Sequence, residues 1–170
     1  MIWVALGNVA GWLAVHVVAG YAAHRLPLSR LERDRFVLRL HPGERRLYER
    51  LGIRRWKDAL PEAGGFFAGG RSKRSLPDEG GRRANVARFA AETRRAELAH
   101  WFAVAGLPVF ALWNPAVGFA GCAAYAVAAN APCIAVQRYN RLRCRRALDR
   151  SSGSRSSSRD GPRTSGSSIP

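Results

Sequence analysis

The residues best suited to chemistry lie in a short charged stretch, Glu92–Trp101, just before a long apolar run. Wound as a helix, this stretch places Thr93, Glu97 and His100 on one face, because residues three or four apart are neighbours on a helix surface. A carboxylate beside a histidine orients the ring, stabilises its cation and prepares it to accept a proton. The sequence therefore predicts His100 as a general base and Glu97 as its orienting carboxylate. The full set of predicted catalytic residues is His100, Glu97, Arg94 and Glu92.

Two other interpretations of this stretch stay open at the level of sequence. It fits an interfacial helix whose charges are solvated and whose histidine is hydrogen-bonded for packing. Glu97 and His100 also form one half of a di-iron helical motif, but such a site needs a second copy and further glutamates from partner helices. No second copy occurs in the chain, and the three cysteines form no metal or redox motif. We therefore predict no metal site and no cofactor.

The charge of the chain is strongly basic and unevenly distributed. Lys and Arg number 28 against 12 Asp and Glu, which gives a formal net charge of +16. No Lys, Arg, Asp or Glu occurs in residues 1–24 or 98–137. Long apolar blocks separated by basic loops are typical of a membrane protein. We therefore interpret the basic residues as a topology signal, with the lipid bilayer as a partner and no nucleic acid.

This pattern predicts an all-α membrane protein with about three transmembrane helices. Residues 1–24 form the first span, and residues 98–137 form a helical hairpin that turns at Asn114-Pro115. The basic residues of 25–97 and 138–150 place both segments in the cytoplasm and the N-terminus outside. The predicted localisation is the cell membrane, with several passes. Cleavage of the first span as a signal peptide is left open.

The segment between the first span and the hairpin is expected to be basic, mostly helical and interfacial. Residues 26–40 mix basic and apolar side chains, as in a helix that lies on an anionic leaflet. Short helices are expected over residues 44–51 and 53–60. Tyr48 and Trp56 are the expected anchors at the level of the lipid headgroups.

Three features are expected near the hairpin and beyond it. Residues 99–113 reach only about 22 Å as a straight helix, short of the roughly 30 Å hydrocarbon core, and Gly106 and Pro108 allow a kink. Asn130-Ala131-Pro132 predicts a polar break in the last span. Residues 151–170 are rich in Ser, Gly and Arg and are expected to form a disordered tail.

A glycine-rich loop, Gly64–Arg74, nearly copies a phosphate-binding loop. Arg71 stands where that motif has Lys and no buried strand precedes it, so a nucleotide-hydrolysing site is rejected. Glycine amides with basic side chains are still suited to hold the phosphate of an activated acyl donor or a lipid. The alternative is a flexible basic loop on the membrane surface. The predicted substrate-binding residues are Arg71, Lys73, Arg74, Asn130, Arg138 and Asn140.

Five stretches within roughly residues 44–143 carry a resemblance to a known family. They are Tyr48–Glu62, Gly69–Leu76, Glu92–Trp101, Asn130–Ile134 and Gln137–Arg141. Of these, ETRRAELAHW and QRYNR are the most specific. In this order they resemble the glycosyl-4,4'-diaponeurosporenoate acyltransferase family, which acts in staphyloxanthin-type carotenoid biosynthesis.

The resemblance implies a membrane-bound acyltransferase at the inner face of the membrane. Its reaction would esterify a sugar hydroxyl of a glycosylated carotenoid acid, or a related glycolipid, with a fatty acyl group. The implied partners are a lipid-like glycosylated acceptor and a fatty acyl donor, for which an acyl-coenzyme A is one candidate. No established catalytic residues come with the resemblance. The alternative is a non-enzymatic membrane protein that docks a partner enzyme at the inner leaflet, and the oligomeric state stays open.

Overall fold

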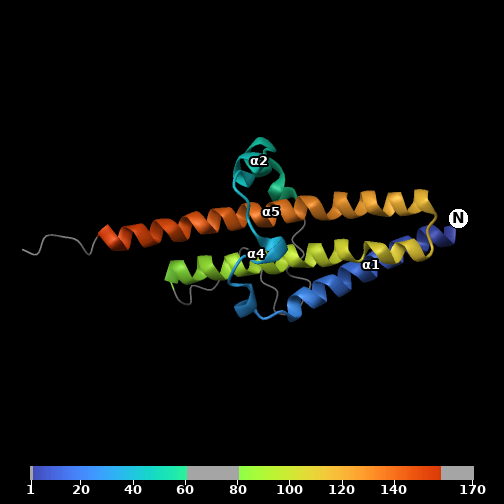
Figure 1. The fold of residues 1–170 in the computed structure, drawn as a ribbon, viewed down its shortest axis with the longest axis horizontal. Helices are drawn as coiled ribbons and strands as arrows, with labels where there is room; N and C mark the ends of the chain where they lie inside the picture. The colour runs from blue at the N-terminus through green and yellow to red at the C-terminus, as the bar shows by residue number, and fades with distance from the viewer. Residues whose placement is uncertain (1, 61–80, 158–170) are drawn as a thin grey trace, which may run out of the picture.

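The computed structural model describes residues 2–60 and 81–157, with side chains through Ser151. Every element in these ranges is helical, which confirms the all-α class for this part of the chain. The long helices α1 (Ile2–Arg25), α4 (Gly81–Ala105) and α5 (Ala116–Ser157) lie side by side (Figure 1). The shorter elements, where η marks a 3-10 helix, are η1 (Leu28–Leu31), η2 (Phe36–Leu38), α2 (Glu44–Arg50), α3 (Ile53–Trp56), η3 (Lys57–Ala59) and η5 (Leu107–Leu112).

Polar contacts at two levels align α1 antiparallel to the chain that follows Arg95. At one end, the side-chain amides of Asn8 and Asn114 exchange two hydrogen bonds, of 2.9 and 2.8 Å. At the other end, Arg95 Nη2 donates to the backbone carbonyl of Leu26 at 2.9 Å. The part of α1 between these contacts rises about 27 Å. The chain from Arg95 to Asn114 is therefore nearly as long as a hydrocarbon core, which is about 30 Å thick.

The second apolar segment reaches this length through a change of helix type. α4 ends and the chain continues as η5, and a 3-10 helix rises about 2.0 Å per residue rather than 1.5 Å. The kink expected at Gly106 and Pro108 is therefore a junction between two helix types. At Gly106 a Cβ atom would approach Val15 Cγ1 to 2.8 Å, so glycine lets α1 pack closely here. α5 then begins at Ala116, directly after the predicted turn.

α1 and α5 are both long and apolar enough to cross a membrane. On α1, the side chains of Trp3, Val9 and Leu13 are 80%, 70% and 67% exposed, whereas Trp12 is buried against Phe110 and α5. Burying a Val or Leu side chain is worth about 1.5–3 kcal/mol relative to leaving it in water. The exposed apolar face of α1 is therefore suited to lipid.

The chain between α1 and α2 wraps around the middle of the bundle. Residues 26–40 do not form the predicted interfacial helix but only the short elements η1 and η2. Leu31 and Leu38 are buried against Ala91 of α4. A short isolated helix is marginally stable, so the burial of these leucines decides the local conformation instead.

α2 and α3 dock on the side of α5. Tyr48 and Ile53 are buried with Val136 and Tyr139, and Trp56 is partly buried against the same cluster. The short helices predicted over residues 44–51 and 53–60 are present as α2 and as α3 followed by η3. Tyr48, however, is a core residue, 7% exposed, and not the headgroup anchor that was predicted. Its ring packs against Val136 and Tyr139 of α5 instead.

α5 is one continuous helix of 42 residues, about 63 Å long. It passes through Pro132, so the polar break expected at Asn130-Ala131-Pro132 interrupts the apolar sequence of this segment but not the helix. A proline removes one backbone hydrogen bond, and packing against neighbouring helices holds the remaining turns in place. α5 also runs on to Ser157, which moves the helix end beyond the boundary predicted at residue 151. Residues 158–170 of the expected tail lie outside the described residues.

Candidate active site

Glu97 lies at the contact between α4 and α5 and has no exposed surface. Arg138 Nη1 donates to Glu97 Oε1 at 2.7 Å, and Arg141 Nη1 forms an ion pair with Oε2 at 2.6 Å. Trp101 Nε1 also donates to Oε1, at 3.2 Å. The predicted pairing of Glu97 with His100 is therefore corrected. A buried carboxylate is stabilised far more by two guanidinium groups than by a neutral ring, and these lie on α5.

The same two arginines extend this contact into a buried ionic cluster. Arg138 donates to Glu44 at 2.6 and 3.0 Å. Arg141 forms an ion pair with Asp34 at 3.0 Å, and Asp34 also accepts from Arg94 at 2.7 Å. The members of the cluster are Asp34, Glu44, Arg94, Glu97, Arg138 and Arg141. Three carboxylates balance three guanidinium groups, so the cluster is neutral and ties together α2, α4, α5 and the chain before α2.

Arg138 has its donors fully engaged. A guanidinium carries five N–H groups. They meet two oxygens of Glu44, one of Glu97 and the backbone carbonyls of Val37, at 2.8 Å, and Arg39. The geometry therefore favours a positioning role for Arg138 over the substrate-binding role predicted from sequence.

The electrostatics of α2 depend on this cluster. Burial raises the pKa of the Glu44 carboxyl, but hydrogen bonds and the charge of Arg138 outweigh burial and hold that pKa below its ordinary value of 4.5. Burial, and next the charge of Glu44, raise the pKa of Tyr48 to about 12. At neutral pH, Glu44 is therefore ionised and Tyr48 is neutral.

His100 is hydrogen-bonded to Asn130 of α5. The ring Nδ1 lies 3.0 Å from Asn130 Oδ1, and Asn130 Nδ2 donates to the backbone carbonyl of Ala126 at 2.9 Å. The second bond fixes the orientation of the amide, so the oxygen faces the ring and can only accept a hydrogen. In the neutral ring Nδ1 therefore carries the hydrogen, and Nε2 keeps a lone pair with which to take a proton.

The neighbourhood of His100 also includes a residue of α1. His16 is close enough to His100 for their charges to interact, and His16 Nε2 lies 3.5 Å from the hydroxyl of Tyr125 on α5. His100 is five residues beyond Arg95, about 7.5 Å further along α4 towards the apolar part. Polar side chains of three helices thus lie near one another among apolar residues, which is the arrangement expected of a functional site in a helical membrane protein.

The other predicted residues lie away from His100. The Thr93 hydroxyl donates to the carbonyl of Ala90 on its own helix, at 2.7 Å. Glu92 pairs with Arg95 at 3.3 Å. Asn140 is buried and lines a pocket further along α5, about 15 Å beyond Asn130. The remaining predicted residues fall outside the described ranges: Arg71, Lys73 and Arg74.

Sequence reasoning missed three members of the buried ionic cluster: Asp34, Glu44 and Arg141. A signal for Arg141 was present, because it lies three residues after Arg138 and so shares its helix face. Asp34 and Glu44 had no such signal, since only the folded loop brings them to α5. Within residues 2–60 and 81–157, no group of three or more His, Cys, Asp or Glu is placed to hold a metal ion.

The fold and site together define a helical protein with membrane-competent helices and a histidine–asparagine pair near their basic end. The family model for glycosyl-4,4'-diaponeurosporenoate acyltransferase matches residues 30–150, well over half of the chain. The chain belongs to this family, as the motifs predicted. The match contains His100, Asn130 and the whole buried ionic cluster. No curated protein and no solved structure matches the chain.

Proposed function

We propose that this protein is a membrane-bound acyltransferase that transfers a fatty acyl group to a sugar hydroxyl of a glycosylated carotenoid acid or a related glycolipid. The family name indicates an acyltransferase and its acceptor. The observation that carries the proposal is the His100–Asn130 hydrogen bond, because it leaves Nε2 of the ring ready to accept a proton. Acyl transfer to a hydroxyl needs a base of this kind.

The reaction balances with His100 as the shuttle for one proton. The sugar hydroxyl oxygen bonds to the acyl carbonyl carbon while its proton passes to His100 Nε2. The tetrahedral intermediate then collapses, and the bond between the acyl carbon and the leaving group breaks. His100 returns the proton to that leaving group, which is a thiol when the donor is a thioester. The ring ends in its starting state, held by Asn130.

The buried ionic cluster positions this pair. Glu97 lies one turn before His100 on α4, and Arg138 lies on α5 about two turns beyond Asn130. The contact of 2.7 Å between Glu97 and Arg138 fixes the position of α4 along α5. It therefore determines whether the His100 ring reaches the side-chain amide of Asn130. Reacting groups must be held to within a fraction of an ångström, so a rigid anchor this close contributes to catalysis without touching substrate.

The topology that fits these positions has three spans, with the N-terminus outside. α1 forms the first span, the chain from Leu98 through η5 the second, and the apolar part of α5 the third. The basic residues of the buried ionic cluster then lie on the cytoplasmic side. An amphipathic acceptor places its sugar at the headgroup level, and His100 lies just inside that level, two residues into the charge-free segment.

An acyl-transfer assay tests the proposal. Membranes that contain the protein receive a labelled acyl-coenzyme A and a panel of glycosylated lipids, among them a glycosyl carotenoid acid. Label that enters an ester supports the proposal and identifies the acceptor. Absence of transfer to every acceptor, with the protein confirmed in the membrane, would contradict it and favour the docking role instead.

A further inference from the structure

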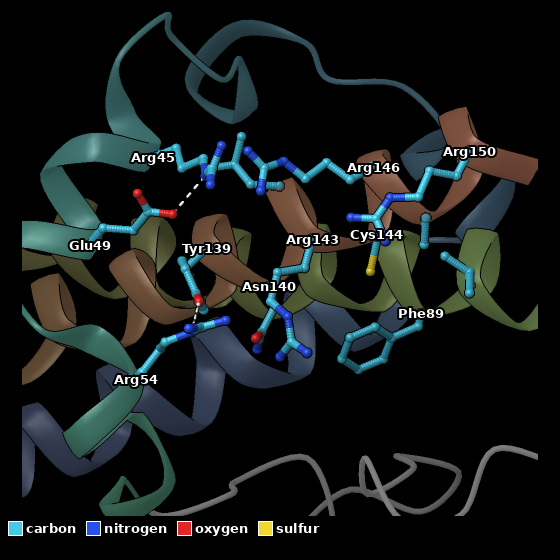
Figure 2. Close-up of a pocket in the computed structure, with 13 residues that line it drawn as sticks. Arg45, Glu49, Arg54, Phe89, Tyr139, Asn140, Arg143, Cys144, Arg146 and Arg150 are labelled. Atoms are coloured by element: carbon cyan, nitrogen blue, oxygen red, sulfur yellow. Dashed lines mark hydrogen bonds and ion pairs between the residues drawn. The ribbon is translucent and has the colours of Figure 1, made fainter. Parts of the chain in front are cut away.

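A pocket of about 560 Å³ lies along the C-terminal part of α5, from Tyr139 to Arg150. It is formed by α2, α3, α4 and α5, with Phe89 and Tyr139 among its aromatic lining residues (Figure 2). Five arginines line it against a single carboxylate, that of Glu49. The arginines are Arg45, Arg54, Arg143, Arg146 and Arg150.

The charge in this pocket is not balanced, unlike that of the buried ionic cluster. Arg45 pairs with Glu49 at 2.7 Å, and Arg54 donates to the Tyr139 hydroxyl at 3.1 Å. Arg143, Arg146 and Arg150 form no ion pair within the described part of the chain. In Figure 2 the guanidinium ends of Arg45 and Arg146 point towards one another. Like charges in a shared hollow repel, and a bound anion removes the repulsion.

The lining is chemically suited to a phosphate ligand with a flat ring. Arginine forks bind phosphate oxygens through two parallel hydrogen bonds. An aromatic face such as that of Phe89 stacks on nucleic-acid bases. We propose that this pocket binds the phosphates of a nucleotide, and that on the proposed function this nucleotide is the end of a coenzyme A thioester donor.

The position of the pocket favours a soluble ligand over a lipid headgroup. Its lining residues on α5 run from Tyr139 to Arg150, about 16 Å along the helix. The headgroup layer on one side of a bilayer is only about 5–8 Å thick. Because α5 continues as one helix out of its apolar part, most of the pocket lies beyond the headgroups. Arg146 is about 24 Å along α5 from Asn130, so the ligand must be long to reach both sites.

Binding calorimetry on the purified full chain in detergent tests this assignment without requiring turnover. Coenzyme A is the probe, and pantetheine, which lacks the phosphates, is the comparison ligand. The test variant carries Arg143→Gln, Arg146→Gln and Arg150→Gln. The matched control carries Arg30→Gln, Arg35→Gln and Arg88→Gln, which are exposed, lie outside the pocket and remove the same charge. Circular dichroism confirms that both variants fold.

Coenzyme A is expected to bind the wild type and the control alike and the test variant at least about tenfold more weakly, with no binding of pantetheine. Equal weakening of coenzyme A binding in the test and control variants would overturn the assignment. It would show that the ligand is attracted by the net charge of the protein and not by this pocket. The assignment would also be overturned if the test variant lost binding to phosphatidylglycerol vesicles while its affinity for coenzyme A stayed unchanged. The phosphate bound in the pocket would then be that of a lipid headgroup. Coenzyme A binding without acyl transfer would leave the pocket in place and contradict the proposed function alone.

Discussion

The imidazole Nδ1 of His100 lies 3.0 Å from the Oδ1 of Asn130, on the neighbouring helix. Because the other amide atom of Asn130 is bonded to Ala126, this contact sets the tautomer of the ring as well as its orientation. A histidine held in this way is prepared to accept a proton at Nε2. The following predictions test this pair and the contacts that position it.

Replacement of Asn130 should slow turnover in a graded way. Asn130→Ala removes the acceptor for Nδ1–H and should lower kcat by about tenfold or more. Asn130→Asp keeps an oxygen in that place and should retain more activity. Neither variant keeps the amide N–H that donates to Ala126, so a higher activity of Asn130→Asp than of Asn130→Ala reports the oxygen that faces His100. Steady-state kinetics measures this order, and equal activity of the two variants would show that the contact is only structural.

Glu97→Gln should destabilise the fold, because Glu97 anchors α4 to α5 and is not itself a partner of His100. It leaves Arg138 and Arg141 without their shared carboxylate in a buried site, which costs about 3–5 kcal/mol. Glu92→Gln is the control, because its pair with Arg95 is partly exposed and is worth less than about 1 kcal/mol. Denaturant unfolding in detergent compares the two. A Glu97→Gln protein as stable as the wild type would refute the anchoring role.

Acid should weaken the attachment of α2 to α5 through Glu44. The pKa of Glu44 is lowered in the folded chain, so its contribution to stability is present above the ordinary value of 4.5 and is lost as the pH falls through the folded value. Glu44→Gln should therefore be less stable than the wild type at pH 7, and the difference should shrink below pH 4.5. The free energy of unfolding of both proteins is measured across this pH range. A difference between them that does not change with pH would contradict the role of Glu44.

The three-span topology predicts which side of the membrane each turn faces. In a chain with Cys122, Cys133 and Cys144 replaced by Ala, Pro115→Cys should react with an impermeant thiol reagent added to intact cells. Asp149→Cys should react only after the membrane is permeabilised. Labelling of Asp149→Cys in intact cells would contradict the proposed orientation.

The sequence supported predictions that depend on local pattern. The absence of charge in residues 1–24 and 98–137 located the apolar helices, and Asn114-Pro115 located the turn between η5 and α5. The motif residues His100 and Asn130 were both singled out, although their hydrogen bond was not. Helix periodicity places residues on a face but does not say which residues of another helix oppose that face.

Most features that could not be predicted from the sequence depend on contacts between segments far apart in the chain. Glu97 was paired with His100 because they are one turn apart on α4, whereas α5 brings two arginines to the same carboxylate. Residues 26–40 were expected on the lipid surface, but burial of Leu31 and Leu38 draws them onto the bundle. In both places packing between elements overrides a reasonable local pattern.

The most direct test of the central claim is the rate of acyl transfer by His100→Ala. The variant should insert into the membrane and fold like the wild type, since His100 is not part of the buried ionic cluster. Its kcat should fall by about 10²–10⁴-fold, the usual contribution of a general base. His41→Ala, at an exposed position outside the site, is the matched control and should keep full activity. Near-normal transfer by His100→Ala would contradict the assignment of His100 as the base.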